Sequence, residues 1–292
     1  MSRLSVLPDL VSFTESSAKA MKSLTIARAT AKEAIRQPAF FVMAVLAGAL
    51  LIFTVFVPYF TFGEDMKMYK DTGLTTISFF CMLLALLTAS STVADEIEGK
   101  TAITLLSKPI NRRQFIVGKF LGIELGVLVL YIILGTLFAA GVWYKFSYDL
   151  RESAGVPDAE KQWAQVMQVM PGLVLGFFEV TVLTSISVAI STRLPMLANL
   201  VVCILIFFLG HLSPVLVVLA EEGRVNELVG FMGKFFAWAL PSLEFFNASP
   251  SISTGAVIPW VAYVLPVFGY CVLYSGAALL FAFLLFEDRD LA

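Results

Sequence analysis

The sequence predicts an all-α integral membrane protein with six transmembrane helices. Hydrophobic residues make up 59% of the 292 residues and charged residues only 14%, too little polar surface to cover a water-soluble globule of this size. Six stretches reach the roughly 20 apolar residues with which a helix crosses a bilayer, and they lack the alternation of barrel strands. We place the spans at residues 39–60, 74–94, 120–142, 172–192, 196–220 and 260–286.

Residues 1–37 are expected to form a cytoplasmic tail and an interfacial helix, separate from the transmembrane domain at 38–292. Between residues 19 and 37, helical spacing places apolar and basic side chains on different faces, and Pro38 ends the pattern. The apolar face carries Leu24, Ala27, Ala31 and Ile35, and the basic face carries Arg28, Lys32 and Arg36. Such a helix lies in the membrane interface near anionic headgroups. The alternative is a charged flank that only orients the first span. This segment has no long apolar core, so no removable signal peptide is expected.

The distribution of Lys and Arg predicts the orientation. An even number of spans puts both termini on one side of the membrane, together with residues 95–119 and 193–195. Of the 20 Lys and Arg residues, thirteen fall on that side and seven on the other. The thirteen are Arg3, Lys19, Lys22, Arg28, Lys32, Arg36, Lys100, Lys108, Arg112, Arg113, Lys119, Arg193 and Arg289. Because basic residues concentrate on the cytoplasmic side, both termini are expected in the cytoplasm.

The segment 95–119, between the second and third spans, carries the clearest functional signal. Asp95, Glu96 and Glu98 crowd the C-terminal end of a helix, where the macrodipole disfavours each negative charge by about 0.3–1 kcal/mol. Helix stability therefore does not explain them. Gly99 can end the helix, and residues 101–107 can then form a short helix before Pro109.

This short helix would offer a partner protein apolar side chains flanked by both signs of charge. Ile103, Leu105 and Leu106 provide the apolar side chains. The alternative is that Lys100, Arg112 and Arg113 only neutralise the three carboxylates within the loop. We favour docking of a soluble partner.

The same segment resembles the cytoplasmic signature of ABC-2 type permeases. The matching order is an acidic pair, Glu98-Gly99, Leu105-Leu106, Pro109-Ile110, Arg112-Arg113 and Gly118-Lys119. The interfacial helix, the six-span layout and the apolar outer segment 239–247 extend the resemblance over most of the chain.

The resemblance implies a coupling helix that docks on a separate nucleotide-binding ATPase subunit. It assigns coupling to Asp95, Glu96, Glu98, Gly99, Leu105, Leu106, Pro109, Arg112, Arg113 and Lys119. It also implies a second permease copy or a sister permease, Mg-ATP bound on the ATPase rather than on this chain, and a bacterial cytoplasmic (inner) membrane.

Gly118, Gly122 and Gly126 recur every fourth residue at the start of the third span. Small residues at this spacing let another helix approach closely, so helix packing is the expected role. A further possibility is that this contact joins the coupling segment rigidly to the bundle. The outer segments are expected to form an external cap at 143–171 and a re-entrant or interfacial hairpin at 221–259, which is apolar but interrupted by Gly and Pro.

Glu179 in the fourth span and His211 in the fifth are the ionisable residues deepest in the spans. The tight turn at 193–195 joins these spans, so the two residues are expected at nearly the same depth in the outer half of the bilayer. An ionisable group in lipid needs a partner or a cavity, so both should face the interior as a possible polar pair. Their role is either structural or in a substrate path. Glu124 is expected close enough to the cytoplasmic face to reach water.

Several function classes lack their motifs in this sequence. There is no GxxxxGK[ST] phosphate loop, since Phe120 follows Gly118-Lys119, and no intramembrane protease motif. The three cysteines lie in apolar runs without metal-binding spacing, and a net charge of −2 does not favour nucleic acid. We expect no enzyme and no metal site on this chain.

Two functions remain, besides a secondary transporter with no ATPase. The first is a permease that exports or extrudes a substrate using a separate ATPase. The second is a mechanotransmission or assembly subunit, driven by the same ATPase without solute transport. Membrane lipids are partners in either case.

Overall fold

The computed structural model describes residues 23–56, 65–98, 112–152 and 159–287, and the regular structure of these residues is entirely helical. Six helices among them are long and apolar enough to cross a membrane. They are α2 (Pro38–Phe56), α3 (Asp65–Glu98), α5 (Arg112–Glu152), α6 (Ala159–Ser191), α7 (Met196–Glu221) and α10 (Leu265–Glu287), the last preceded by a π-helical turn, Trp260–Val264. The predicted all-α fold with six spans is confirmed.

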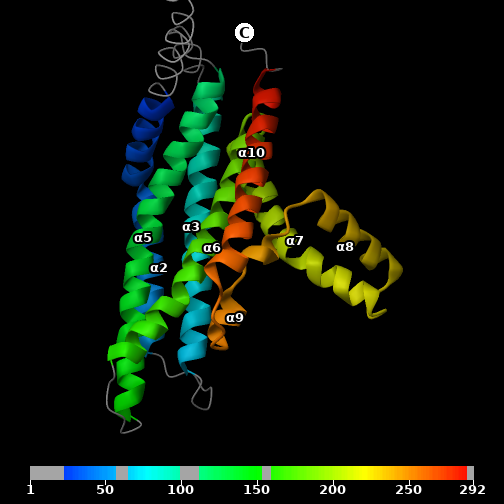
Figure 1. Cartoon of the computed structure of the whole chain (residues 1–292). Coiled ribbons are helices and arrows are strands. Elements are labelled where there is room, and N and C mark those ends of the chain that lie inside the picture. Colours follow the sequence, from blue (N-terminus) through cyan, green and yellow to red (C-terminus); the bar gives the residue numbers. More distant parts are fainter. Residues whose placement is uncertain (1–22, 57–64, 99–111, 153–158, 288–292) are drawn as a thin grey trace, which may run out of the picture.

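The helices α3 and α6 form the centre of the bundle, and Figure 1 shows α2, α5 and α10 running alongside them. Thr184, Ser185 and Ser187 of α6 are fully buried. Small side chains at such positions let membrane helices approach closely. In contrast, most of the apolar side chains of α2, α7 and α10 lie on the outside of the chain. Lipid or another subunit can cover these faces, because in a membrane the exposed surface is itself apolar.

The outer segment 143–171 is mostly helix. It consists of the end of α5 and the start of α6, which continue past the predicted spans, and the structure does not describe residues 153–158 between them. Trp143 and Trp163 pack edge to face at 5.2 Å, and the Gln162 amide donates to the Ser147 hydroxyl at 2.8 Å. The polar composition that suggested a loop therefore belongs to helix ends that extend beyond the apolar stretch.

The outer segment 221–259 begins as a helical hairpin. Figure 1 shows α7 bending away from the bundle and α8 (Glu227–Ala239) folding back along it, so that the pair projects sideways. Gly223, with φ of 68°, lies in the turn between them. A Cβ on Gly230 would lie 2.9 Å from Ala220 and one on Gly233 would lie 2.8 Å from Leu216, so the glycines permit the contact. The opposite face of α8 is apolar and exposed.

The chain then returns to the bundle through the 3-10 helix η1 (Leu243–Phe246) and the short helix α9 (Ser249–Ser253). The Tyr270 hydroxyl of α10 accepts from the Ser242 amide at 3.1 Å. On α9, the Ser249 hydroxyl donates to the Asp71 carboxylate of α3 at 2.7 Å. A Cβ on Gly210 of α7 would lie 2.8 Å from Leu243. These contacts place η1 against α7 at the middle of the bundle.

Candidate functional site

The described parts of the predicted coupling segment are the end of α3 and the start of α5. They lie at the same end of the bundle as the N-terminal helix, which comprises residues 23–36, and the end of α10 (Figure 1). The backbone of α3 is helical through Asp95, Glu96 and Glu98, and α5 begins at Arg112. Four residues of the prediction lie outside the described residues, namely Gly99, Leu105, Leu106 and Pro109. The role of this segment stays a prediction.

Arg113 and Lys119 are the two coupling candidates whose side chains are described. Arg113 is exposed. Lys119 is buried, and its Nζ lies 5.9 Å from the centroid of the Phe115 ring, within the range of a cation–π contact. Phe115 stacks on Phe286 of α10 at 6.1 Å. Lys119 therefore lies inside the packing at the start of α5, whereas Arg113 is accessible to a partner.

The glycine stripe of α5 packs on the N-terminal helix. A Cβ on Gly118 would lie 2.8 Å from Ile26, one on Gly122 2.5 Å from Thr30, and one on Gly126 2.9 Å from Ala34. Both partners advance by four residues at each contact, so the two helices run parallel and in register.

This contact buries the face of the N-terminal helix that carries Ala27, Thr30 and Ala34. Leu24 lies outside this face and is 64% exposed. The helix packs lengthwise on α5. Its predicted position at the membrane interface stays a prediction.

Glu179 of α6 and His211 of α7 lie together inside the bundle. His211 Nε2 is 3.4 Å from Glu179 Oε1, within ion-pair distance, although the geometry does not form a hydrogen bond. Only 8% of the Glu179 side chain is exposed, compared with 26% for His211. The tight turn after α6 fixes the register of the two antiparallel helices, and this register brings the two residues to the same depth.

The contact between the side chains of Glu179 and His211 is favourable when one of the two facing groups carries a proton. His211 Nδ1 lies 3.1 Å from the Phe207 carbonyl, which can only accept, so Nδ1 is a donor. If Nε2 then lacks a proton, its lone pair faces the carboxyl group, and that contact is favourable only when Glu179 is protonated. The stable forms are therefore imidazolium with carboxylate or imidazole with carboxylic acid. With this single proton, the pair has no net charge.

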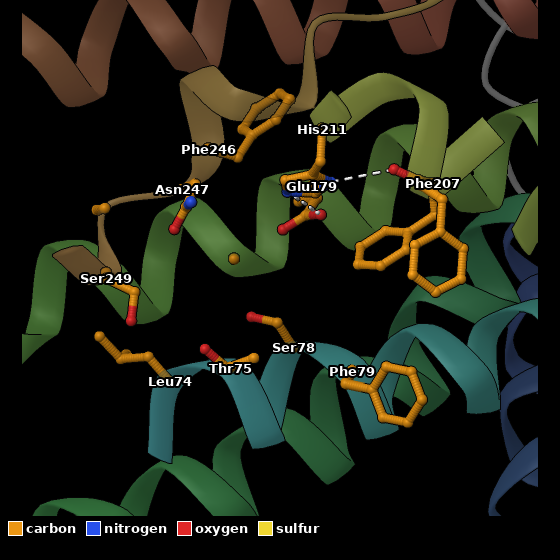
Figure 2. A pocket seen from close by; sticks show the side chains of 14 residues that line it. Leu74, Thr75, Ser78, Phe79, Glu179, Phe207, His211, Phe246, Asn247 and Ser249 are labelled. Atoms are coloured by element: carbon orange, nitrogen blue, oxygen red, sulfur yellow. Dashed lines mark hydrogen bonds and ion pairs between the residues drawn. The ribbon is translucent and has the colours of Figure 1, made fainter. Parts of the chain in front are cut away.

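The pair lines a cavity of about 280 Å³ between α3, α6, α7 and η1, which Figure 2 shows from close by. The floor is formed by one turn of α3 with Thr75 and Ser78, and Phe246 and Asn247 lie on the opposite side. The described residues that line the cavity are Leu74, Thr75, Ser78, Phe79, Gly172, Gly176, Glu179, Phe207, Phe208, His211, Phe246, Asn247, Ala248 and Ser249.

Two glycines of α6 lie in the cavity wall near Glu179 and let neighbouring side chains pack closely against α6. Gly172 and Gly176 lie on its helix face, seven and three residues before it. A Cβ on Gly176 would lie 2.4 Å from the Ser78 hydroxyl and 2.5 Å from the Tyr131 hydroxyl. The pattern of two glycines and a carboxylate on one face of an apolar helix was therefore a signal for a closely packed wall that contains Glu179. The prediction identified only the ionisable pair.

Glu124 does not reach water, and that expectation is wrong. It is buried between α5 and α6, where the Thr181 hydroxyl donates to its Oε2 at 3.1 Å. Its Oε1 has no hydrogen-bond partner among the described residues. The long α5 explains the difference, because it begins at Arg112 and places Glu124 more than three turns into the helix.

The sequence analysis did not predict two clusters of buried polar residues. Asn199 of α7 donates to Ser90 of α3 and to Ser187 of α6. Lys70 of α3 is buried and donates to Gln165 and Gln168 of α6. Polar residues with amide or ammonium groups within apolar runs signal such contacts.

A comparison with protein families identifies a match over nearly the whole chain. The family model described as ABC-2 family transporter protein matches residues 11–291. A search of curated proteins finds no match. The matched range contains all six spans and the predicted coupling segment.

Proposed function

The chain belongs to the ABC-2 family of transporter proteins, and we propose that this permease subunit couples ATP hydrolysis on a separate ATPase to the export or extrusion of a substrate. The observation that carries the proposal is the family match over residues 11–291, together with the carboxylates at the end of α3. Mg-ATP would be bound by the ATPase, because this sequence has no phosphate loop. The proposed location is the bacterial cytoplasmic membrane with both termini in the cytoplasm.

The packing supports a route from the ATPase to the bundle. The proposed coupling segment includes the end of α3, which is central, and the start of α5, which packs on the N-terminal helix through its glycines. A force on this segment would therefore act on two helices that both pack against α6. Since α6 carries Glu179, the same movement would reach the cavity.

We propose that two permeases assemble with two ATPases, either as two copies of this chain or with a sister permease. The apolar faces of α2, α7 and α10 offer surface for that contact as well as for lipid.

A test begins with a tagged chain purified from its native host together with any ATPase that binds it. Glu98→Ala and Leu106→Ala should each reduce ATPase recovery or coupled hydrolysis at least fivefold, because truncating an interface anchor typically costs more than about 1 kcal/mol. Glu227→Ala is the matched control, since it removes an exposed carboxylate on α8 and should leave both unchanged. Unaltered association and coupling in both variants of the coupling segment would refute the coupling role.

The projecting α7–α8 hairpin favours mechanotransmission as the second candidate. Its exposed face carries Leu228, Phe231, Phe235 and Trp238, which suits an external protein partner. In liposomes, an exporter's ATPase rate responds to a transported compound. The rate of a mechanotransmitter responds to the partner protein instead.

A further inference from the structure

We propose that the cavity beside Glu179 binds an organic cation, specifically an ammonium group carried on an apolar body. As a binding site, the proposal stands on the cavity alone. As the assignment of a substrate class, it rests on the proposed export function.

The groups in and around the cavity favour cations over anions. Glu179 and His211 are its only ionisable lining residues, and no Lys or Arg is among the described residues that line it. Two of the polar lining residues donate to carboxylates outside the cavity: Asn247 to Glu244 at 3.3 Å and Ser249 to Asp71 at 2.7 Å. Two further carboxylates therefore lie one hydrogen bond away from the lining.

The nearby ammonium group of Lys70 does not change this conclusion. It lies one turn before Leu74 on α3, donates to Gln165 and Gln168, and does not line the cavity.

The fold holds the carboxyl group of Glu179 in a buried position, away from solvent. The residue is 94% buried, with 6% of its surface exposed, and its Oε1 has no hydrogen-bond partner among the described residues. Figure 2 shows this carboxyl group directed toward the space between α3 and η1. This oxygen lies 3.4 Å from His211 Nε2 without a hydrogen bond, so a cation in the cavity would pair with the carboxylate by displacing the one proton that Glu179 and His211 hold.

The remaining lining selects an organic cation over a metal ion. Phe79, Phe207, Phe208 and Phe246 line the cavity. Aromatic rings attract a cation through their faces and bind the apolar groups around it. A volume of about 280 Å³ is far larger than a metal ion and near the lower bound, roughly 300 Å³, of small-molecule pockets. The described residues also contain no cluster of three or more metal ligands.

Exposed lining residues of α3 and α7 open the cavity to the outside of the chain. Phe79 and Phe208 line it, and they are 40% and 59% exposed. A ligand could therefore enter from the membrane. An ammonium group could come from a free amphiphile or from the headgroup of an ethanolamine lipid, and both present the same chemistry to Glu179.

The experiment uses the full chain without ATPase in nanodiscs of phosphatidylglycerol. The probe is benzylammonium, whose N–H groups can donate to Glu179, and benzylsulfonate is the anion with the same benzyl group. Isothermal titration calorimetry should show binding of the ammonium and none of the sulfonate. Glu179→Gln should weaken binding at least tenfold, because it removes the one carboxylate among the described lining residues.

Glu124→Gln is the matched control, a second buried carboxylate that does not line the cavity, and it should retain affinity within about twofold. All variants share the same anionic lipid, so surface attraction of the probe cancels. Should Glu179→Gln not fold, Phe246→Ala provides the second test, with an expected loss of about threefold to tenfold.

Adding phosphatidylethanolamine to the nanodiscs distinguishes the two sources of the ammonium group, a free amphiphile and a lipid headgroup. Competition that lowers probe affinity identifies a lipid headgroup as an occupant, and unchanged affinity identifies a free amphiphile. The proposal is overturned by absence of probe binding, by equal affinity in wild type and Glu179→Gln, or by equal binding of benzylsulfonate. Since no ATPase is present, these outcomes leave the coupling proposal untouched.

Discussion

Asn199 joins three helices through one side chain. Its amide nitrogen lies 2.9 Å from Ser90 Oγ on α3 and 3.0 Å from Ser187 Oγ on α6, and its carbonyl oxygen accepts from Cys203 of α7 at 3.3 Å. All four residues are buried. A polar group at this depth has no water to replace a lost partner, so its hydrogen bonds determine how α7 packs on the centre of the bundle.

Asn199→Leu should lower the thermal unfolding temperature in detergent. Each interhelical hydrogen bond in a membrane contributes about 0.6 kcal/mol on average and up to about 1.7 kcal/mol, and this change removes bonds to two helices. The expected loss is therefore about 1–3 kcal/mol. Asn226→Leu is the control, because Asn226 is exposed and its side chain makes no capping hydrogen bond. Equal unfolding temperatures for the two variants would contradict this account.

At the scale of the element, the glycine stripe of α5 sets how closely the N-terminal helix can approach. A Cβ on Gly122 would lie 2.6 Å from the Ala27 carbonyl as well as close to Thr30 Cβ. Neither atom is the end of a flexible side chain, so the two helices must separate.

Gly122→Ala should destabilise the chain by about 1–3 kcal/mol, the usual cost of overpacking, despite the higher helix propensity of alanine. Gly276→Ala is the matched control, since a Cβ there would meet nothing within 4 Å. Thermal unfolding should show a lower midpoint for Gly122→Ala and an unchanged or higher midpoint for Gly276→Ala. A stabilised Gly122→Ala would show that the two helices do not pack as described.

Prediction from sequence succeeded where one physical signal determines the outcome. Apolar length located all six spans, and the short turn after α6 determined the common depth of Glu179 and His211. Hydropathy underestimated the lengths of α5 and α6, because it detects the apolar stretch of each helix and not the polar turns beyond it.

Other features depend on tertiary packing. The glycine spacing predicted a close helix contact, but periodicity does not reveal which helix makes it. Phe246 and Asn247 reach the cavity from an irregular return segment after α8, and no helical or strand period determines that path. The coupling role of residues 95–119 stays a prediction.

At the scale of the whole molecule, the six spans predict which parts of the chain face each side. Cysteines placed at 67, 155 and 225 should react with an impermeant reagent added outside intact cells, and cysteines at 10, 111 and 290 should not. The native Cys81, Cys203 and Cys271 are all buried, so they should contribute little background. Labelling of position 111 from outside would overturn the orientation and the coupling role with it. Permeabilised cells provide the control, since positions 10, 111 and 290 should then react.

The parallel contact between the N-terminal helix and α5 also has a consequence for biosynthesis. Gly118 follows Ile26 by 92 residues, so the ribosome completes one surface long before the other. At about 5–20 residues per second, the interval is roughly 5–20 s. During this time α2 and α3 can insert while Ala27, Thr30 and Ala34 await their glycine partners. A nascent chain arrested before residue 118 therefore presents this face to chaperones and proteases, and one arrested after residue 126 can cover it.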